Sequence, residues 1–308
     1  MKKQILTIFR SKKRTLSEQL LCSQLGISGT EVCRHIEELQ QLGYKIRASS
    51  AGYKLISSPE ALFSWEFSER EKSIHYFPEL NSTMETAKQM AQNNCPAFTV
   101  IIAETQKKGR GRLQREWRSS KGGLYFTIIL RPQIQPAFCY RMNFAASLVL
   151  ARTLCGMFNI SARVKWPNDI LVNGKKLSGM LSEIQAESDR VTFLNIGIGI
   201  NVNNSPSSQE PQAVSLREIL GKKISRKCIL AAFLDNFQDF INTHPLHNVI
   251  SEWKQYAVNL NKHVKIVTTR DTSHGLAIDV DKNGALVLKL ENGTIKKIIY
   301  GDCFLRQT

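Results

Sequence analysis

Residues 98–130, "FTVIIAETQKKGRGRLQREWRSSKGGLYFTIIL", join two apolar, β-rich runs through a long basic loop. The loop covers residues 107–123 and carries seven Lys or Arg side chains against a single acid, Glu116. A loop of this length without secondary structure inside a compact domain is usually functional or disordered. The two flanking runs therefore predict neighbouring strands of a sheet, with a candidate binding loop between them.

The centre of this loop has the composition of an anion site. Gly109 and Gly111 allow the backbone to approach a ligand closely. Arg110 and Arg112 between them offer planar donors that suit carboxylate and phosphate groups. The pattern matches neither a P-loop nor a dinucleotide fingerprint. It favours anion binding, and a solvated basic loop is the alternative.

The surrounding sequence predicts an α+β domain built on a mixed sheet. Helical patterns cover residues 83–93 and 141–158, and two more amphipathic helices are expected at 227–241 and 247–256. Strands are expected in the runs "IHYF", "FTVIIAE", "GGLYFTIIL", "ARVKWPNDILV", "KLSGMLSEI" and "TFLNIGIGINVN".

The run "RVKWPNDILV", residues 163–172, places a lysine inside an apolar strand. Burying an unpaired charge is costly, so Lys165 is either paired or used chemically. The alternative is a structural turn that carries a surface lysine. Trp166 could pack or stack, and Asn168 and Asp169 direct polar groups to one edge.

Two further motifs mark the same domain. In "ELNSTMETA", Ser82 and Thr83 precede a helix, where they either cap its N-terminus or line a polar pocket. In "NIGIGINVN", Gly197 and Gly199 interrupt a strand, which often marks the close approach of a ligand or of another backbone. Asn201 lies at the end of that strand.

The first 64 residues predict a winged helix-turn-helix. Two helical patterns are separated by Gly26, and Ser28 and Glu31 have capping-box spacing at the second helix. A hairpin pattern follows in "YKIRASSAGYKLI". The second helix would present DNA-contacting side chains, and a small protein-interaction module is the alternative. The candidate DNA-binding residues are Ser28, Thr30, Arg34 and His35.

The rest of the chain limits the class of protein. The 308 residues have a formal net charge of +16, which favours polyanionic partners. Seven cysteines without a C-x-x-C pair favour free thiols in a reducing compartment, and no run is long enough to span a membrane. A cytoplasmic protein without a protein-built metal cage is expected. Closely spaced strands with turns at residues 281–284 and 291–293 predict a small β-barrel at 261–308.

The four central motifs, in this order, resemble those of a biotin–protein ligase. The flanking winged helix-turn-helix and small barrel make the chain similar to the bifunctional type that also represses the biotin operon. The resemblance implies a class II synthetase-like catalytic domain at residues 65–260 and an SH3-like domain at 261–308. It implies biotin and ATP as substrates with Mg²⁺ on the phosphates, a biotinyl-5′-AMP intermediate, and transfer to a lysine of the biotin carboxyl carrier protein of acetyl-CoA carboxylase.

The resemblance also implies roles for individual residues. Lys165 and Arg112 would be catalytic. The expected biotin site comprises Ser82, Thr83, Met84, Gln106, Arg110, Gly111, Arg112 and Lys165. The expected ATP and adenylate site comprises Arg110, Arg112, Trp117, Lys165, Asn168, Asp169 and Asn201. Operator DNA of biotin synthesis genes and a second copy of the chain, once the adenylate is bound, are the other expected partners.

The chain departs from the family pattern at three positions. The family loop usually runs G-R-G-R-R-G-R-x-W, whereas Leu113 and Gln114 stand here where Arg and Gly are usual. Met84 stands where Asn is common after Ser-Thr. Two other functions remain alternatives: a DNA-binding regulator that senses a small molecule without ligase activity, and a lipoate–protein ligase.

Overall fold

The computed structural model describes residues 1–67, 69–208 and 210–305. The chain forms two compact units, residues 1–72 and residues 73–308. Within the described residues, none of the helices is both long enough and apolar enough to cross a membrane.

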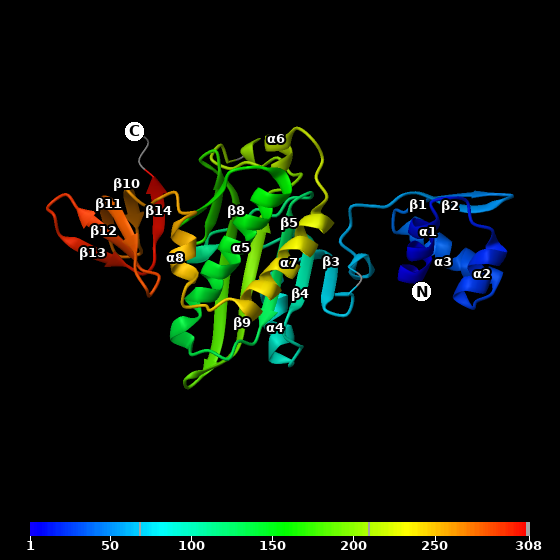
Figure 1. Cartoon of the computed structure of the whole chain (residues 1–308), viewed down its shortest axis with the longest axis horizontal. Helices are drawn as coiled ribbons and strands as arrows, with labels where there is room; N and C mark the ends of the chain where they lie inside the picture. The colour runs from blue at the N-terminus through cyan, green and yellow to red at the C-terminus, as the bar shows by residue number, and fades with distance from the viewer. Residues whose placement is uncertain (68, 209, 306–308) are drawn as a thin grey trace. The chain divides into compact units, whose positions relative to one another are not determined.

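The first unit is a winged helix-turn-helix, as predicted (Figure 1). Ser28 accepts a hydrogen bond from the Glu31 backbone, and the Glu31 carboxylate accepts one from the Ser28 backbone, so the predicted capping box is present. An N-terminal helix that the sequence pattern did not predict completes the unit. Its elements are α1 (Lys2–Lys12), α2 (Glu18–Leu25), α3 (Gly29–Gln41), β1 (Lys45–Ser49), β2 (Gly52–Ser57) and the 3₁₀ turn η1 (Ser64–Glu66).

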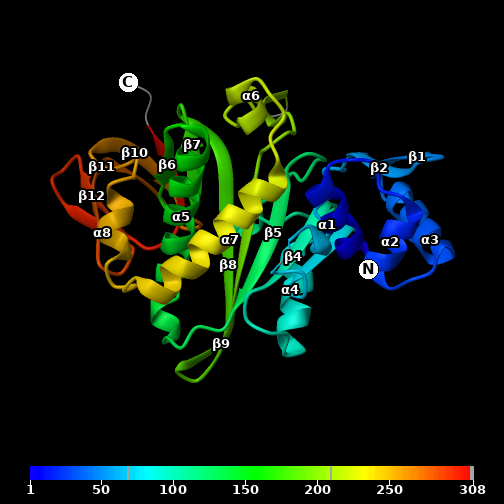
Figure 2. The ribbon, with the colours of Figure 1, turned by 45° about the vertical axis from the view of Figure 1, so that its right-hand side comes forward.

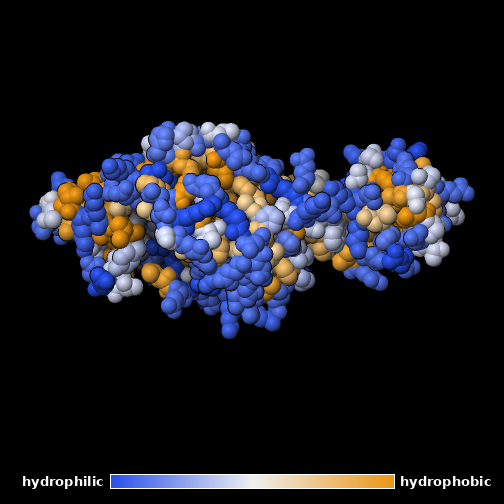
Figure 3. Space-filling model, turned by 90° about the horizontal axis from the view of Figure 1, so that it is seen from below, coloured by the Kyte–Doolittle hydropathy of each residue, from blue (hydrophilic) through white to orange (hydrophobic). Residues whose placement is uncertain are grey.

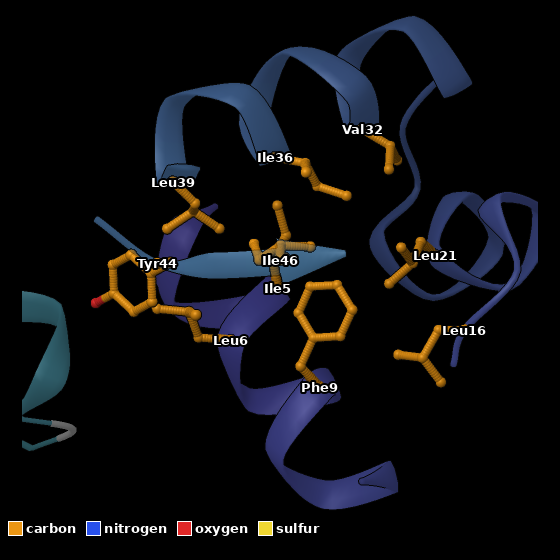
Figure 4. Packing of buried hydrophobic residues seen from close by; sticks show 10 residues of the cluster. All are labelled: Ile5, Leu6, Phe9, Leu16, Leu21, Val32, Ile36, Leu39, Tyr44 and Ile46. Atoms are coloured by element: carbon orange, nitrogen blue, oxygen red, sulfur yellow. The ribbon is translucent and has the colours of Figure 1, made fainter. Parts of the chain in front are cut away.

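The core of this unit is a single apolar cluster (Figure 4). Ile5 and Phe9 of α1 point toward Val32 and Ile36 of α3, and each of these side chains is at most 2% exposed. Ile46 of β1 covers the cluster from the hairpin side. Because α1 supplies a large share of these buried side chains, the helix-turn-helix depends on it for a closed core.

The segment after the hairpin packs back on the same unit. Trp65 Nε1 donates to the Tyr44 hydroxyl at 3.0 Å, and that hydroxyl donates to the Glu66 carboxylate. Glu66 also pairs with Arg10 at 2.9 Å. These contacts hold Trp65 and Glu66 on the first unit, which extends to residue 72. The division into 1–64, 65–260 and 261–308 stays a prediction.

The second unit is built on a seven-stranded mixed sheet, as predicted. The strand order is β3-β4-β5-β9-β8-β7-β6, and only the β3–β4 pair is parallel. The strands are β3 (Ile74–Leu80), β4 (Thr99–Gln106), β5 (Leu124–Leu130), β6 (Ala162–Lys165), β7 (Asp169–Val172), β8 (Lys175–Glu187) and β9 (Arg190–Ile200).

Helices cover both faces of this sheet, and alternation along the strands decides which residues face which helix. Figure 2 shows α5 (Tyr140–Phe158) and α7 (Arg226–Thr243) lying across one face. Phe126 of β5 packs there against Phe233 of α7. On the other face, α4 (Thr83–Gln92) covers the β5 and β9 residues Ile129 and Phe193. Two short helices, α6 (Leu216–Leu220) and α8 (Val249–Lys254), complete the unit.

The C-terminal segment forms a five-stranded antiparallel sheet of order β13-β12-β11-β10-β14. Figure 3 shows hydrophobic residues at its surface, at the left end of the view, and Ile299 is 77% exposed. The strands are β10 (Lys262–Val267), β11 (Thr272–Val280), β12 (Leu286–Leu290), β13 (Ile295–Ile298) and β14 (Asp302–Leu305).

Trp166 fastens this sheet to the central one. Its indole is 1% exposed, and Nε1 donates to the Gly284 carbonyl in the β11–β12 turn at 3.0 Å. Its backbone N–H donates to Asn259 Oδ1 at 2.9 Å. The Tyr140 hydroxyl donates to the Lys282 carbonyl of the same turn at 2.7 Å, at an exposed site. The tryptophan between β6 and β7 therefore has a structural role.

Trp166→Phe should destabilise the second unit by about 1–2 kcal/mol, because it leaves the buried Gly284 carbonyl without its donor. Thermal unfolding followed by near-ultraviolet circular dichroism would measure the change. Tyr140→Phe is the matched control, because its hydrogen bond is exposed and its loss should cost less than about 0.5 kcal/mol. Equal effects of the two substitutions would contradict the special role of the buried bond.

Candidate active site

One large pocket of about 930 Å³ opens on the α4 side of the central sheet. All of the residues expected to bind biotin or ATP line it, although the sequence separates them by up to about 120 positions. These residues are Ser82, Thr83, Met84, Gln106, Arg110, Gly111, Arg112, Trp117, Lys165, Asn168, Asp169 and Asn201. Strand β14 of the C-terminal sheet also contributes to the wall.

A polar end of the pocket lies at the start of α4. Gln106 Oε1 accepts from the Thr83 backbone at 2.8 Å and from its hydroxyl at 3.1 Å. Gln106 Nε2 donates to Ser119 of the loop at 2.7 Å, and Thr127 donates to the Thr83 hydroxyl at 2.9 Å. Ser82 does not cap the helix with its side chain, and its buried Oγ has no hydrogen-bond partner among the described residues. This end can therefore recognise a small polar group.

The floor of the pocket is glycine. Gly197 and Gly199 face the pocket from β9, because residues two apart on a strand share a face. A Cβ on Gly197 would overlap Met84 Sδ, and a Cβ on Gly199 would overlap the Trp117 indole. The two strand glycines thus admit side chains from α4 and from the loop, which agrees with the close approach that the sequence predicts.

The other end of the pocket carries two lysines on one carboxylate. Asp169 Oδ2 lies 3.1 Å from Lys165 Nζ, and Asp169 Oδ1 lies 2.8 Å from Lys176 Nζ. Burial alone would raise the pKa of Asp169, but Lys176 and Lys165 outweigh it, so this pKa lies below its ordinary value. Lys176 Nζ also lies 5.3 Å from the centre of the Trp117 ring.

Lys176 is absent from the sequence-based site. It is the second residue of β8, after the turn at residues 173–174, so neither an apolar surrounding nor a glycine pattern distinguishes it from the exposed Lys175. The signal available in the sequence was the short spacing between Asp169 and Lys176, which fits a hairpin that joins β7 to β8. The β6–β7 register pairs Lys165 with Asp169, and the β7–β8 register places Lys176 opposite Leu171, two residues from Asp169.

The basic loop folds into a small hairpin. Gly111 N–H donates to the Arg115 carbonyl at 2.7 Å, and Trp117 N–H donates to the Gly109 carbonyl at 2.9 Å. Leu113 and Gln114 form the tip with φ of 51° and 57°. Two successive left-handed residues define the type I′ turn, which normally selects glycine or asparagine. Glycine, the usual family residue at position 114, would suit this backbone better than glutamine.

The loop arginines have partners on three different segments. Arg110 pairs with Glu183 of β8 at 2.5 Å. Arg112 donates to Asn168 Oδ1 at 3.3 Å and to the Gly301 carbonyl at 3.2 Å, and Arg115 pairs with Asp302 at 2.6 Å. Burial lowers the pKa of Arg112, and the nearby Asp302 and Asp169 oppose this shift.

Two asparagines are held rigidly at the edge of the pocket. Asn168 Nδ2 donates to the Met180 carbonyl, and Asn201 Oδ1 accepts from Asn204 Nδ2 at 2.9 Å. Asn201 is 5% exposed and ends β9 through a backbone bond to Leu177. Their fixed amides suit a ligand that must be oriented, such as a nucleotide.

The candidate DNA-binding residues lie on the first unit. Thr30 and Arg34 are exposed on α3, and Arg34 pairs with Glu38 at 3.3 Å. Ser28 is used by the capping box. The His35 side chain is only 15% exposed, and its Nδ1 lies 3.4 Å from Glu38, so it is less available than the sequence pattern suggested.

The chain resembles curated proteins over nearly its whole length. It is 35% identical to the Bifunctional ligase/repressor BirA of Bacillus subtilis over 98% of each chain. The chain belongs to the biotin protein ligase family. Residues 76–203 match the Biotin/lipoate A/B protein ligase family, residues 260–306 the Biotin protein ligase C terminal domain, and residues 2–54 an HTH domain.

Other members of the biotin protein ligase family support the same assignment. The Bifunctional ligase/repressor BirA of Escherichia coli is 26% identical, with 94% of this chain and 92% of that protein covered. The solved biotin protein ligase of Aquifex aeolicus in complex with biotin and ATP matches with a TM-score of 0.64 and 31% identity. That match covers 77% of this chain and 100% of the Aquifex chain.

Gln114→Gly should stabilise the hairpin tip of the loop by about 0.5–1 kcal/mol, because glycine adopts positive φ without steric cost. Slower trypsin cleavage after Arg112 and Arg115 in the ligand-free protein would report it. Gln114→Ala is the matched control and should not slow cleavage, because alanine keeps the strain. Equal protection by both substitutions would argue against a left-handed tip.

Proposed function

We propose that this chain joins biotin to a lysine of the biotin carboxyl carrier protein of acetyl-CoA carboxylase, using ATP, and that it represses biotin synthesis genes. The central observation is the pairing of Lys165 and Lys176 with Asp169 at one end of the pocket, opposite the polar end at Thr83 and Gln106. Such a pocket suits a ligand with a neutral polar head and an anionic tail. Biotin has a ureido ring at one end and a carboxylate at the other.

In the first step, a biotin carboxylate oxygen attacks the α-phosphorus of ATP, the bond to the β-phosphate oxygen breaks, and pyrophosphate leaves. Both reactants are anions, so their approach requires positive charge. We assign this role to Lys165, Lys176, Arg110 and Arg112. Asp169 holds the two ammonium groups in place before substrate arrives. Asn168 and Asn201 orient the nucleotide, and Trp117 packs beside the adenine.

In the second step, the acceptor lysine amine attacks the carbonyl carbon of biotinyl-5′-AMP. An amide bond forms, the carbon–oxygen bond to AMP breaks, and the amine loses a proton. The loop over the pocket would exclude water, which would otherwise hydrolyse the mixed anhydride.

Among the described residues, no group of three His, Cys, Asp or Glu side chains could hold a metal ion, and Asp169 is already paired with two lysines. We expect Mg²⁺ to enter with the phosphates of ATP.

Lys176→Gln should lower kcat/KM for biotin-dependent pyrophosphate release by about 100-fold, and Lys165→Gln by a similar factor. Each substitution removes one positive charge that stabilises the negative charge developing at the α-phosphorus. Both variants need the neighbouring Lys175→Gln as control, which should keep near-normal activity, since Lys175 points to solvent. Normal activity of the Lys176 variant would exclude that lysine from the reaction. Lipoate added in competition tests the lipoate-ligase alternative.

The repressor function is assigned to the first unit. Its winged helix-turn-helix carries exposed Thr30 and Arg34 on the helix that such folds place in the major groove. We propose that the adenylate-bound chain forms a homodimer on the operator of biotin synthesis genes, in the cytoplasm. A regulator without ligase activity would bind the same DNA but release no pyrophosphate.

Arg34→Ala should weaken operator binding by about 1–3 kcal/mol. A gel-shift titration with the promoter of a biotin synthesis operon, with and without biotinyl-5′-AMP, measures it. Arg270→Ala, which removes an exposed arginine from the C-terminal sheet, should leave binding unchanged. An equal loss in both variants would indicate a general charge effect instead of helix contacts.

A further inference from the structure

Arg226 is a buried cation outside the pocket, at the first position of α7. It is 3% exposed. Its Nη1 and Nη2 donate to the two carboxylate oxygens of Glu104 at 2.9 and 3.1 Å, in a bidentate pair. Nη1 also donates to the Gly123 carbonyl at 2.9 Å. Gly123 is the residue at which the basic loop returns to the sheet.

A buried ion pair contributes little net stability, because both charged groups lose their hydration. The positive end of the α7 dipole opposes an arginine at this position. Replacing a buried ion pair by well-packed apolar side chains is often neutral or stabilising. The pair nevertheless does what apolar groups cannot, because the guanidinium fork fixes the direction of the Gly123 carbonyl.

Asn203 adds a second attachment at the same place. Its backbone N–H donates to the Gly122 carbonyl at 2.9 Å. Its side chain exchanges two hydrogen bonds with the Ile224 backbone, at 2.8 and 2.9 Å. The start of α7, the segment after β9 and the end of the loop are therefore joined at one point.

Between this point and the pocket, hydrogen bonds hold the loop at two successive residues, Ser120 and Ser119. The Tyr125 hydroxyl donates to the Ser120 carbonyl at 2.8 Å, and Gln106 donates to Ser119 at 2.7 Å. Trp117 comes next and lies on the glycine floor. The position of its indole thus depends on the attachment at Gly123.

We propose that Arg226, Glu104 and Asn203 are positioning residues that anchor the C-terminal end of the loop, so that Trp117 and the hairpin stay over the acyl-adenylate. The inference rests on the proposed ligase function. None of the three residues lines the pocket, so they act through the loop. Loss of the anchor should therefore increase escape of the intermediate more than it slows its formation.

The test compares the full-length protein with the double variant Glu104→Met/Arg226→Met, which leaves no unpaired charge. Protein loaded with radiolabelled biotinyl-5′-AMP is diluted and its release is timed by filter retention. Single-turnover pyrophosphate release measures formation. We expect release to be roughly ten-fold faster, from the loss of buried charged hydrogen bonds, with formation changed less than about three-fold.

Two further variants separate positioning from general stability. Arg152→Met/Glu252→Met removes another ion pair, 2.9 Å long, between α5 and α8, and should leave release unchanged. Arg226→Lys keeps the charge but loses the fork, so release should be intermediate. Trypsin cleavage of the ligand-free loop at residues 107–118 should follow the same order in all variants, without any catalysis.

Unchanged release and unchanged cleavage in both Arg226 variants would overturn the proposal, whether or not the double variant is less stable. Equal acceleration by the Arg152 control would also overturn it, because a local anchor could not explain that result. Absence of biotin-dependent pyrophosphate release from the unmodified protein would instead defeat the ligase function, while the cleavage order would still test the anchor.

Discussion

The interaction on which the site depends is the carboxylate of Asp169 held between two ammonium groups. Both lysines lie within ion-pair distance of this one carboxylate, one on each oxygen. Asp169 fixes the direction of both ammonium groups at 3.1 and 2.8 Å. The β6–β7 and β7–β8 hairpins bring Lys165 and Lys176 to it, so the register of these three strands determines where the positive charge lies.

Four segments form the pocket around Asp169 and its two lysines: the central sheet, α4, the basic loop and the C-terminal sheet. The central sheet supplies the glycines of the floor, and α4 supplies the polar end. The loop supplies arginines on a hairpin whose stem is held by backbone hydrogen bonds. The C-terminal sheet supplies Asp302 and the Gly301 carbonyl. Through Trp166 it is also joined to the motif that carries Lys165, so the last domain is part of the site.

Much of this could be predicted from the sequence, because the signals are local. Capping at Ser28, the strands around the basic loop and the strand glycines each depend on a few neighbouring residues. The predicted winged helix-turn-helix and mixed sheet were confirmed, and the segment predicted as a small SH3-like β-barrel forms a small five-stranded antiparallel sheet. Lys176 and Asp302 were missed because their meaning comes from partners across a hairpin or from a distant domain. No local pattern reports such a pairing.

His35 shows the converse limit. Its place beside Arg34 on the second helix of the motif suggested an exposed side chain. His35 is next to the apolar stripe, however, and its side chain packs beside Glu38 and is 15% exposed. The roles of the pocket residues remain predictions. The structure places these residues around one pocket.

The loop arginines already have anionic partners in the protein: Glu183 for Arg110 and Asp302 for Arg115. These carboxylates balance the charges of Arg110 and Arg115. A neutral molecule of the right shape has nothing to offer in exchange for these carboxylates. An anionic group can compete with the carboxylates for Arg110 and Arg115, whereas Arg112, held by Asn168 and the Gly301 carbonyl, exchanges neutral partners.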